Sequence, residues 1–276
     1  MQASTHPIIA FVGAGNMAFS LTRGLLSDGH PATHLRVADP LPEALAKYST
    51  AEITTFTDNN LAIQGADVVV LAVKPQVAPQ VTGELAISSN QLLVSIAAGV
   101  SLQSLNTWTS DAQPIVRCMP NTPALLGAGM SGLYANTCCS PEQKGFAEQI
   151  LQAGGTTLWV HKESELDAVT AVSGSGPAYF FRLMEAMIEA GEALGLSRET
   201  ATILTLQTAY GAALMAKNTD EQPATLRHNV TSPGGTTAAA LAVMEKDDLG
   251  GLIQRALSAA HARSIALAEE FGTGSN

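Results

Sequence analysis

The sequence has little positive charge. Its 276 residues include 14 Lys and Arg against 24 Asp and Glu, which gives a formal net charge of −10. The basic residues form no cluster of the kind that binds a nucleic-acid backbone, so we expect no nucleic-acid partner. With 46% hydrophobic and 14% charged residues, the composition is that of a folded globular protein and not of a disordered chain.

Long apolar runs and paired cysteines are also lacking. No uninterrupted stretch of about 18 apolar residues occurs, and the N-terminal sequence has no basic region followed by a long apolar run. The three cysteines, Cys118, Cys138 and Cys139, are an odd set without metal-type spacing to the six histidines. We therefore expect no membrane association, no structural metal and a reducing, cytoplasmic compartment.

Short apolar segments alternate with helical segments from Ile8 to about Val160. Fully apolar segments such as DVVVLAV (67–73) are typical of parallel strands whose two faces are covered by helices. The alternation predicts an α/β fold, with a Rossmann-type doubly wound sheet at the N-terminus. Strands are expected at 8–12, 35–39, 52–56, 67–73, 92–96, 114–118, 131–135 and 156–160.

After about Lys162 the strand pattern gives way to helices. Helical periodicity predicts helices over 178–196, 198–217 and 250–270, and a further one directly after Gly235. The predicted domains are a dinucleotide-binding domain, residues 1–163, and an all-α domain, residues 164–276. Because the second is rich in Ala, Met and Leu and poor in charge, we expect another subunit to cover it in a homo-oligomer.

The segment FVGAGNMA (11–18) follows the first expected strand and opens a helix. Gly13 can form the tight turn, and Gly15 lets the backbone approach a pyrophosphate at the helix N-terminus. Ala18 occupies the third position of the dinucleotide fingerprint. The strand–turn–helix context favours dinucleotide binding over a tight turn without a ligand.

Two charged residues end or follow predicted strands of the sheet. Asp39 ends the second strand, where a carboxylate accepts hydrogen bonds from a ribose 2′-hydroxyl and repels a 2′-phosphate. The alternative is that Asp39 caps a short helix that begins near Pro42. Lys74, in AVKPQ (72–76), lies at the carboxyl edge where such sheets bind ligands, or is simply solvated.

A second glycine-rich segment, NVTSPGGTT (229–237), precedes a helix in the all-α domain. Taken alone, it is a turn in which Thr231 or Ser232 caps the helix and Pro233 begins it. The glycines of SGSGPAY (173–179) are interpreted first as allowing close helix crossing and not as a second phosphate loop.

Six motifs in order, GAGNMA, AVKPQ, IAAG, RCMPNTP, SGSGPAY and VTSPGGTT, resemble pyrroline-5-carboxylate reductase from about residue 8 to about residue 270. The resemblance implies NAD(P)H-dependent reduction of the C=N bond of L-pyrroline-5-carboxylate to L-proline, the last step of proline biosynthesis. It also implies a helical domain that interlocks two subunits. Dimers of this family often assemble further into decamers.

The resemblance assigns cofactor contacts to the first domain and to one residue of the second. The first glycine-rich loop would hold the phosphates, Asn59 the adenosine ribose, and Ala98 would lie near the nicotinamide. The full set is Val12, Gly13, Ala14, Gly15, Asn16, Met17, Asp39, Asn59, Val73, Lys74, Ala98 and Asn229. Asp39 departs from the Ser, Asn or Arg that 2′-phosphate-binding members carry, so NADPH and NADH both remain open as the cofactor.

The resemblance also gives the second glycine-rich loop a role. Backbone N–H groups of Gly234, Gly235, Thr236 and Thr237 would bind the substrate carboxylate as an anion nest at a helix N-terminus. Thr237 would contact the substrate nitrogen and donate or relay a proton, with the hydroxyl of Ser232 nearby.

Two rival functions fit parts of the sequence. A relative of the 3-hydroxyacid dehydrogenases shares the Rossmann-plus-helical organisation, but the helical domain has no G-x-x-x-K motif, and its lysine nearest the middle is Lys217. A non-catalytic dinucleotide sensor would keep GAGNMA and would have no use for SPGGTT.

Overall fold

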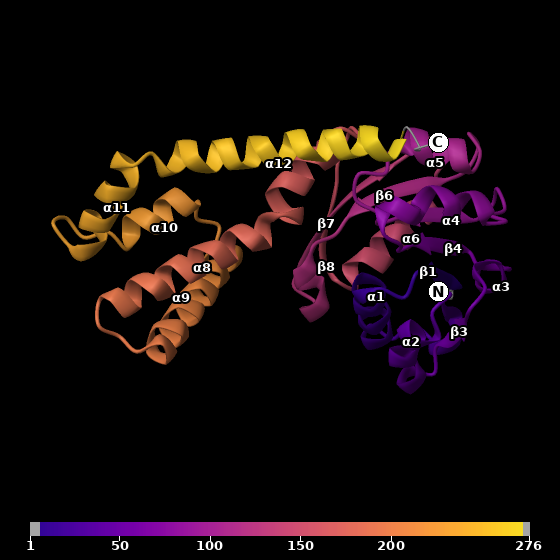
Figure 1. Cartoon of the computed structure of the whole chain (residues 1–276), viewed down its shortest axis with the longest axis horizontal. Helices are drawn as coiled ribbons and strands as arrows, with labels where there is room; N and C mark the ends of the chain where they lie inside the picture. The colour runs from indigo at the N-terminus through magenta and orange to yellow at the C-terminus, as the bar shows by residue number, and fades with distance from the viewer. Residues whose placement is uncertain (1–5, 273–276) are drawn as a thin grey trace. The chain divides into compact units, whose positions relative to one another are not determined.

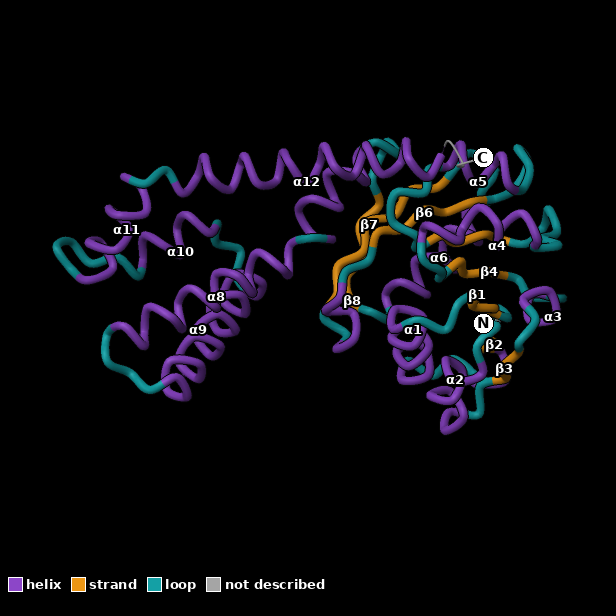
Figure 2. The backbone as a smooth tube through the Cα atoms, viewed as in Figure 1, coloured by secondary structure: helices purple, strands orange, loops and turns teal. Residues whose placement is uncertain are grey.

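The computed structural model describes residues 6–272 of the chain. Its contacts separate the chain into two compact units. The first runs to Ser175 and includes the residues from Ala260 onward, and the second is Gly176–Ala259. Strands and helices alternate in the first unit, whereas the second is helical (Figures 1 and 2). The predicted α/β fold followed by an all-α region is confirmed.

One sheet organises the first unit. Over residues 6–272 it has eight strands, in the order β3-β2-β1-β4-β5-β6-β7-β8. Neighbouring strands are parallel, apart from the antiparallel pair β6 and β7. The strands are β1 (Ile9–Val12), β2 (Leu35–Ala38), β3 (Thr54–Phe56), β4 (Val68–Leu71), β5 (Leu92–Ser95), β6 (Ile115–Met119), β7 (Gly129–Ala135) and β8 (Gly155–Trp159).

The first six strands have the doubly wound order, in which the chain reverses direction across the sheet between β1 and β4. All eight predicted strands are present, with ends that differ from the expected bounds by at most two residues. Ligands of such sheets bind beyond the carboxyl ends of the strands at the reversal point. The fold therefore places the candidate cofactor site after β1, β2, β4 and β5.

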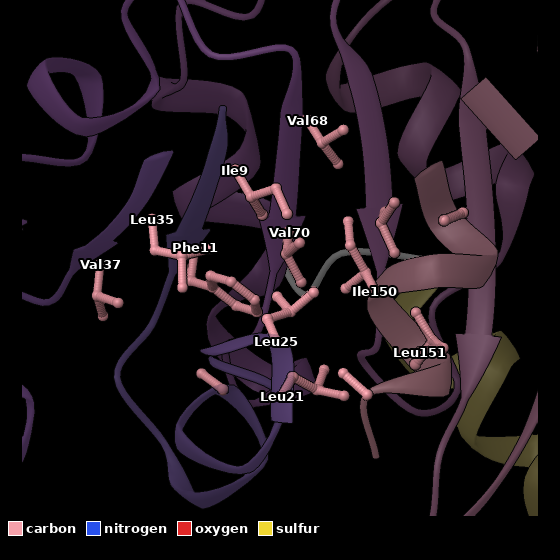
Figure 3. Packing of buried hydrophobic residues seen from close by; sticks show 14 of the residues in the cluster. Ile9, Phe11, Leu21, Leu25, Leu35, Val37, Val68, Val70, Ile150 and Leu151 are labelled. Carbon is pink, nitrogen blue, oxygen red and sulfur yellow. The ribbon is translucent and has the colours of Figure 1, made fainter. Parts of the chain in front are cut away.

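Helices cover both faces of this sheet because alternate residues of each central strand point to opposite sides. On one face, Phe11 and Val70 pack with Leu21 and Leu25 of α1 (Asn16–Ser27) and with Ile150 of α6 (Pro141–Gln152), as Figure 3 shows. Figure 1 shows α4 and α5 on the opposite side from α1. On that side the core joins alternate strand residues to α3 (Asn59–Ile63), α4 (Ala78–Glu84) and α5 (Leu102–Trp108).

The remaining helices of the first unit are short. They are α2 (Pro42–Leu45), α7 (Glu165–Val169), a turn of π-helix at Thr170–Gly174, and 3-10 turns at Ala32–His34, Ala46–Ala51, Pro75–Val77 and Thr122–Leu126. The sequence did not predict α7 or the π-helical turn, because segments of five residues are too short to show a helical repeat.

The second unit contains α8 (Gly176–Ala193), α9 (Arg198–Asn218), α10 (Pro223–Asn229), α11 (Thr236–Lys246) and the start of α12 (Leu249–Gly272). Helix α10 was not predicted, since its sequence PATLRHN has no apolar repeat. Helices α8 and α9 lie side by side (Figure 1). A side chain at Gly191 of α8 would approach the Cβ atom of Ala201 to 3.0 Å, so glycine permits this close packing.

The two compact units do not coincide with the predicted domains 1–163 and 164–276. Leu166 and Ala171 are buried in the first unit, and Ser264 of α12 donates a hydrogen bond to Asp167 at 2.7 Å. These contacts attach α7, the π-helical turn and the last turns of α12 to the sheet. The compact units therefore do not divide between residues 163 and 164. That boundary remains a prediction about the domains of the family.

Across residues 6–272 no helix has the length and apolar character that crossing a membrane requires. The same residues contain no cluster of three or more His, Cys, Asp or Glu arranged to hold a metal ion. All three cysteines are free. Burial raises the pKa of the Cys118 thiol, and it raises the pKa of Cys139 to about 11, so both behave as core residues and not as nucleophiles.

Candidate active site

The first glycine-rich loop joins β1 to α1 at the carboxyl edge of the sheet. Gly13 has φ +100°, and a Cβ atom there would lie 2.6 Å from the carbonyl oxygen of Ala72, just after β4. Its N–H donates to the carbonyl oxygen of Ala38 at 2.8 Å. Glycine is therefore required at position 13 because the loop passes between the ends of β2 and β4.

Gly15 is the N-cap residue of α1 and differs from Gly13 in its surroundings. Its φ of −66° suits any residue, and a Cβ atom would meet only the Ala72 carbonyl oxygen, at 3.9 Å. No side chain caps α1, and Gly15 and Asn16 are exposed. The N–H groups of the first turn are thus open to an anion such as a pyrophosphate.

The Asp39 carboxylate is held beside this loop. One oxygen accepts the Ala14 N–H at 2.9 Å, and the other accepts the Leu41 N–H at 3.0 Å. Leu41, and not Asp39, is the N-cap residue of α2, which has no side-chain cap. The alternative interpretation of Asp39 as a helix cap is therefore wrong.

Asn59 begins α3, directly beyond the end of β3. Asp58 caps this helix by accepting the N–H groups of Asn60 and Leu61 at 2.8 and 3.3 Å. The side-chain oxygen of Asn59 is buried and has no hydrogen-bond partner among the described residues. A buried acceptor without a donor is costly, and a sugar hydroxyl would satisfy it. The residues present thus fit a dinucleotide.

The remaining predicted contacts of the first unit lie along the same edge. Val73 and Lys74 follow β4, Lys74 is exposed, and Val73 lies against Gly13. Ala98 follows β5 and is half-buried. The next residue, Gly99, has φ +72°, and a Cβ atom there would lie 3.2 Å from Leu267 and from Phe271 of α12. The structure brings Val12–Met17, Asp39, Asn59, Val73, Lys74 and Ala98 to one edge of the sheet.

Asn121 follows β6 on this edge and makes contacts that the sequence did not predict. Its amide nitrogen donates to the carbonyl oxygen of Ser173 at 3.0 Å, and its amide oxygen accepts the Met130 N–H at 2.9 Å. It therefore joins the loop after β6 to the π-helical turn and to β7. These partners lie 52 and 9 residues away, so no local pattern could have revealed them.

Glu163 is a second residue that sequence reasoning missed. Its carboxylate accepts the Leu102 N–H, at the start of α5, at 2.7 Å, and it also pairs with Arg117 of β6. Both side chains are shielded, with 12% of Arg117 and 31% of Glu163 exposed. The pair fixes the first turn of α5, which follows the loop that contains Ala98.

The second glycine-rich loop lies in the second unit, between α10 and α11. The N–H of Gly235 donates to the carbonyl oxygen of Ser232 at 3.0 Å, and Gly234 has φ +71°. Gly235 is the N-cap residue of α11, and no side chain caps the helix. The hydroxyl of Thr231 instead donates to the backbone carbonyl oxygen of Arg227 in α10.

The interpretation of Thr231 or Ser232 as the cap of α11 is therefore wrong, and the helix begins at Thr236, not at Pro233. Ser232, Gly234 and Thr236 are exposed, and Thr237 is half-buried. The first N–H groups of α11 are open, as an anion nest requires. Asn229 ends α10 in this unit, and its contact with the cofactor remains a prediction.

A doubly wound sheet with an open helix N-terminus after β1 and an acidic residue after β2 defines a Rossmann-type oxidoreductase that uses a nicotinamide dinucleotide. Two family models match the chain. Residues 8–99 match the model described as NADP oxidoreductase coenzyme F420-dependent, and residues 163–267 match that for pyrroline-5-carboxylate reductase dimerisation.

Curated relatives and solved structures are similar over almost the whole chain. A pyrroline-5-carboxylate reductase of Pseudomonas aeruginosa is 53% identical over 269 residues, which is 96% of this chain and 98% of that one. That of Haemophilus influenzae is 45% identical over 94% of this chain and 97% of its own. A structure from Coxiella burnetii has a TM-score of 0.91 at 41% identity and covers 96% and 99% of the two chains. The chain belongs to the pyrroline-5-carboxylate reductase family.

The Plasmodium falciparum pyrroline carboxylate reductase, whose structure has NADP bound, is 30% identical, with a TM-score of 0.85 over 96% of this chain and all of that one. More distant likenesses show the fold alone, such as a ketol-acid reductoisomerase at 13% identity and a TM-score of 0.65. Relatives of this closeness favour neither a 3-hydroxyacid dehydrogenase nor a dinucleotide sensor.

Proposed function

We propose that two open helix N-termini, that of α1 and that of α11, bind the ligands of the reaction that family membership establishes. The chain reduces L-pyrroline-5-carboxylate to L-proline with NADPH or NADH, the last step of proline biosynthesis. The observation that carries the function is 53% identity to a pyrroline-5-carboxylate reductase over nearly its full length.

The capping pattern supports this choice of site. Helices α3, α5, α6 and α9 each have an Asp or Ser side chain that caps the first turn. Helices α1 and α11 have glycine at the N-cap instead, without a side-chain cap. Glycine leaves the first-turn N–H groups unpaired and lets a ligand approach closely, so these two termini are suited to anions.

At the first terminus, Gly13, Ala14, Gly15, Asn16 and Met17 would bind the pyrophosphate, and Asn59 would accept a ribose hydroxyl. Val12, Val73 and Lys74 would line the groove. The small side chain of Ala98 leaves room for the flat nicotinamide ring beside the end of β5. The bound cofactor supplies a hydride, and the residues of this chain orient it and exclude water.

At the second terminus, the N–H groups of Gly234, Thr236 and Thr237 would bind the substrate carboxylate, and Gly235, whose N–H donates to the Ser232 carbonyl oxygen, would form the turn beside it. The imine carbon receives the hydride and the ring nitrogen takes a proton, so the chemistry needs no pair of carboxylates. The Thr237 hydroxyl would donate a hydrogen bond to that nitrogen or relay its proton, with Ser232 beside it. Asn229, at the end of α10, would also contact the cofactor.

We also propose that the chain works as a homodimer. The match of residues 163–267 to the dimerisation model supports this, as do the exposed apolar side chains of α8, α9, α11 and α12. A decamer of five dimers is the proposed larger assembly, which a mass of ten times the 28.5 kDa chain would identify. The three free cysteines support a reducing, cytoplasmic compartment.

The test is whether the purified protein oxidises NADPH or NADH when it is given pyrroline-5-carboxylate. Correctly folded protein that oxidises neither would overturn the assignment. Thr237→Ala should lower kcat by about 100-fold or more, the contribution of a positioned proton donor, with cofactor binding unchanged. Thr237→Ser keeps the hydroxyl and should restore most of the rate. Equal rates for the alanine and wild-type proteins would remove Thr237 from the chemistry.

A further inference from the structure

The Asp39 carboxylate is fixed in place at the end of β2. Its two oxygens accept the Ala14 N–H at 2.9 Å and the Leu41 N–H at 3.0 Å, and its own N–H donates to the carbonyl oxygen of Phe56 on β3 at 3.1 Å. Rotation of this side chain away from the glycine-rich loop would leave two backbone donors without their charged acceptor. The negative charge is therefore a permanent part of the loop that receives the dinucleotide.

Two side chains that follow the adjacent strands β2 and β3 offer hydrogen-bond acceptors. Each carboxylate oxygen of Asp39 keeps a lone pair after its bond to the backbone, and the buried oxygen of Asn59 has no donor among the described residues. A ribose presents hydroxyl groups, which can donate to both. A 2′-phosphate presents acceptor oxygens and negative charge, and it would face an acceptor of the same sign.

Two basic side chains near this position have other partners. The Arg36 guanidinium lies at the other face of β2 and donates to the carbonyl oxygens of Ala62 and Gln64, at 3.1 and 2.7 Å. The Lys47 ammonium lies over the rings of Phe19 and Tyr48, 5.4 and 5.6 Å from their centroids. Of these two, Lys47 is the cation that could turn toward a 2′-phosphate, so it must be tested.

The negative charge of Asp39 also acts on the buried side chain of Tyr48. Its ring is buried, and its hydroxyl has no partner among the residues that the structure describes. Burial raises the pKa of Tyr48, and the negative charge of Asp39 raises it further. The rings on which Lys47 lies are therefore neutral and carry no charge of their own.

We propose that Asp39 makes this chain prefer NADH over NADPH, by accepting the adenosine 2′-hydroxyl and repelling a 2′-phosphate. The inference rests on the proposed function, since it concerns the cofactor of the same site. The NADP in the Plasmodium falciparum structure belongs to a protein 30% identical to this one and does not fix the preference here.

The experiment measures the dissociation constants of NADH and NADPH by the change in nucleotide fluorescence on binding, without substrate. Wild type should bind NADH about 10- to 100-fold more tightly, the effect of one charge-assisted hydrogen bond gained against one repulsion. Asp39→Asn keeps the shape of the side chain and removes its charge, and it should bring the ratio close to one. Equal affinities in wild type, or an unchanged ratio in Asp39→Asn, would overturn the proposal.

Three further measurements test the proposal even if Asp39→Asn disturbs the loop. Lys47→Ala should leave the ratio unchanged, and a selective loss of NADPH affinity would assign a phosphate contact to Lys47 and contradict the proposal. In wild type, AMP should compete with NADH more strongly than adenosine 2′,5′-bisphosphate does, and the reverse order would refute a role for Asp39. Oxidation of NADPH in preference to NADH with pyrroline-5-carboxylate would refute the preference and leave the proposed function standing.

Discussion

The two compact units of the chain treat their large apolar side chains in opposite ways. In the first, the central strands β1, β4 and β5 are wholly buried between two layers of helices. In the second, Phe180, Ile203 and Leu252 are 64%, 61% and 54% exposed, and α9 buries only Ala201 and Thr205 among its described residues. The first unit is specified by its own core, whereas the second needs another surface to cover it.

This difference in burial means that the two glycine-rich loops are held in place by different contacts. The first loop is held by the sheet, through Gly13, Ala38 and Ala72. The second is held by short helices, α10 and α11, in a unit with little core of its own. In the proposed homodimer, its geometry would depend on the second subunit, which would link assembly to substrate binding.

The largest effect is expected from charges placed on the exposed apolar face of α9. In Ile203→Asp/Leu206→Asp the two side chains, one turn apart, would each lose about 1.5–3 kcal/mol of burial across an interface. The dimer should weaken by about 100- to 10,000-fold, with loss of activity at micromolar protein. Light scattering coupled to gel filtration, over a range of protein concentrations, measures the assembly.

The matched control is Leu158→Asp on β8 of the first unit, a residue that is 54% exposed. It should leave the assembly unchanged, because an isolated exposed side chain contributes little to stability. A double α9 variant that keeps the wild-type mass and activity would show that the second unit does not need this face covered.

Sequence predicted the first unit more completely than the second for a physical reason. Buried parallel strands are continuous apolar runs, and DVVVLAV could be placed by composition alone. Helix α10 depends on its neighbours and on Pro223 at its first position, and PATLRHN carries no periodic signal. Local patterns therefore revealed what the chain buries by itself, and they missed what its tertiary contacts impose.

The same contrast between local patterns and tertiary contacts explains which site residues could be predicted from the sequence. Gly13 and Gly15 were predicted because a strand–turn–helix motif is local. The role of Asp39 stayed open, since the direction of its carboxylate is set by Ala14, 25 residues away. The contacts of Glu163 with Leu102 and Arg117 span 61 and 46 residues, and only the folded chain brings them together.

A pair of glycine variants separates the fold of the first unit from its function. Gly13→Ala places a Cβ atom 2.6 Å from a backbone oxygen at φ +100°, and it should destabilise the protein by about 2–4 kcal/mol, measured by urea unfolding. A Cβ atom at Gly15 would make only an ordinary contact, 3.9 Å from the Ala72 carbonyl oxygen, so Gly15→Val should keep the wild-type midpoint. It should nevertheless weaken cofactor binding by about 10- to 100-fold, because the side chain obstructs charge-assisted contacts to the pyrophosphate.

The reverse result would contradict this division of roles. If Gly13→Ala unfolds like wild type, the loop is not held against β4 as the structure indicates. If Gly15→Val binds NADH and NADPH normally, the first turn of α1 does not bind the pyrophosphate. Growth of a proline-requiring bacterium that carries Gly15→Val gives the same answer inside a cell.

Asparagine variants compare a half-buried amide of the first unit, at Asn121, with an exposed one of the second, at Asn218. Asn121→Leu leaves the Ser173 carbonyl and the Met130 N–H without their partners and should cost about 1–3 kcal/mol of unfolding free energy. Asn218→Leu on α9 removes one exposed bond to Leu214 and should cost less than about 0.5 kcal/mol. Similar losses in the two variants would show that the π-helical turn does not depend on Asn121.

The smallest expected effect is a pH dependence confined to the first unit. His30 is 3% exposed, and its ring nitrogen Nε2 donates to the carbonyl oxygen of Pro7 at 3.0 Å. Burial lowers the pKa of His30 from about 6.5, and the neighbouring rings of His6 and His34, 5.1 and 6.2 Å away, lower it further. The folded state therefore binds a proton less readily than the unfolded state.

Because this pKa is lowered, its contribution to stability is complete above pH 6.5 and is lost as the pH falls through that value toward the lowered one. The slope for one proton is at most about 1.4 kcal/mol per pH unit. His30→Gln keeps a donor and cannot titrate, so its urea midpoint should change less than that of wild type between neutral and mildly acidic pH. His228→Gln of α10, in the second unit, is the control and should follow wild type, whereas an unchanged slope in His30→Gln would assign the pH dependence to other groups.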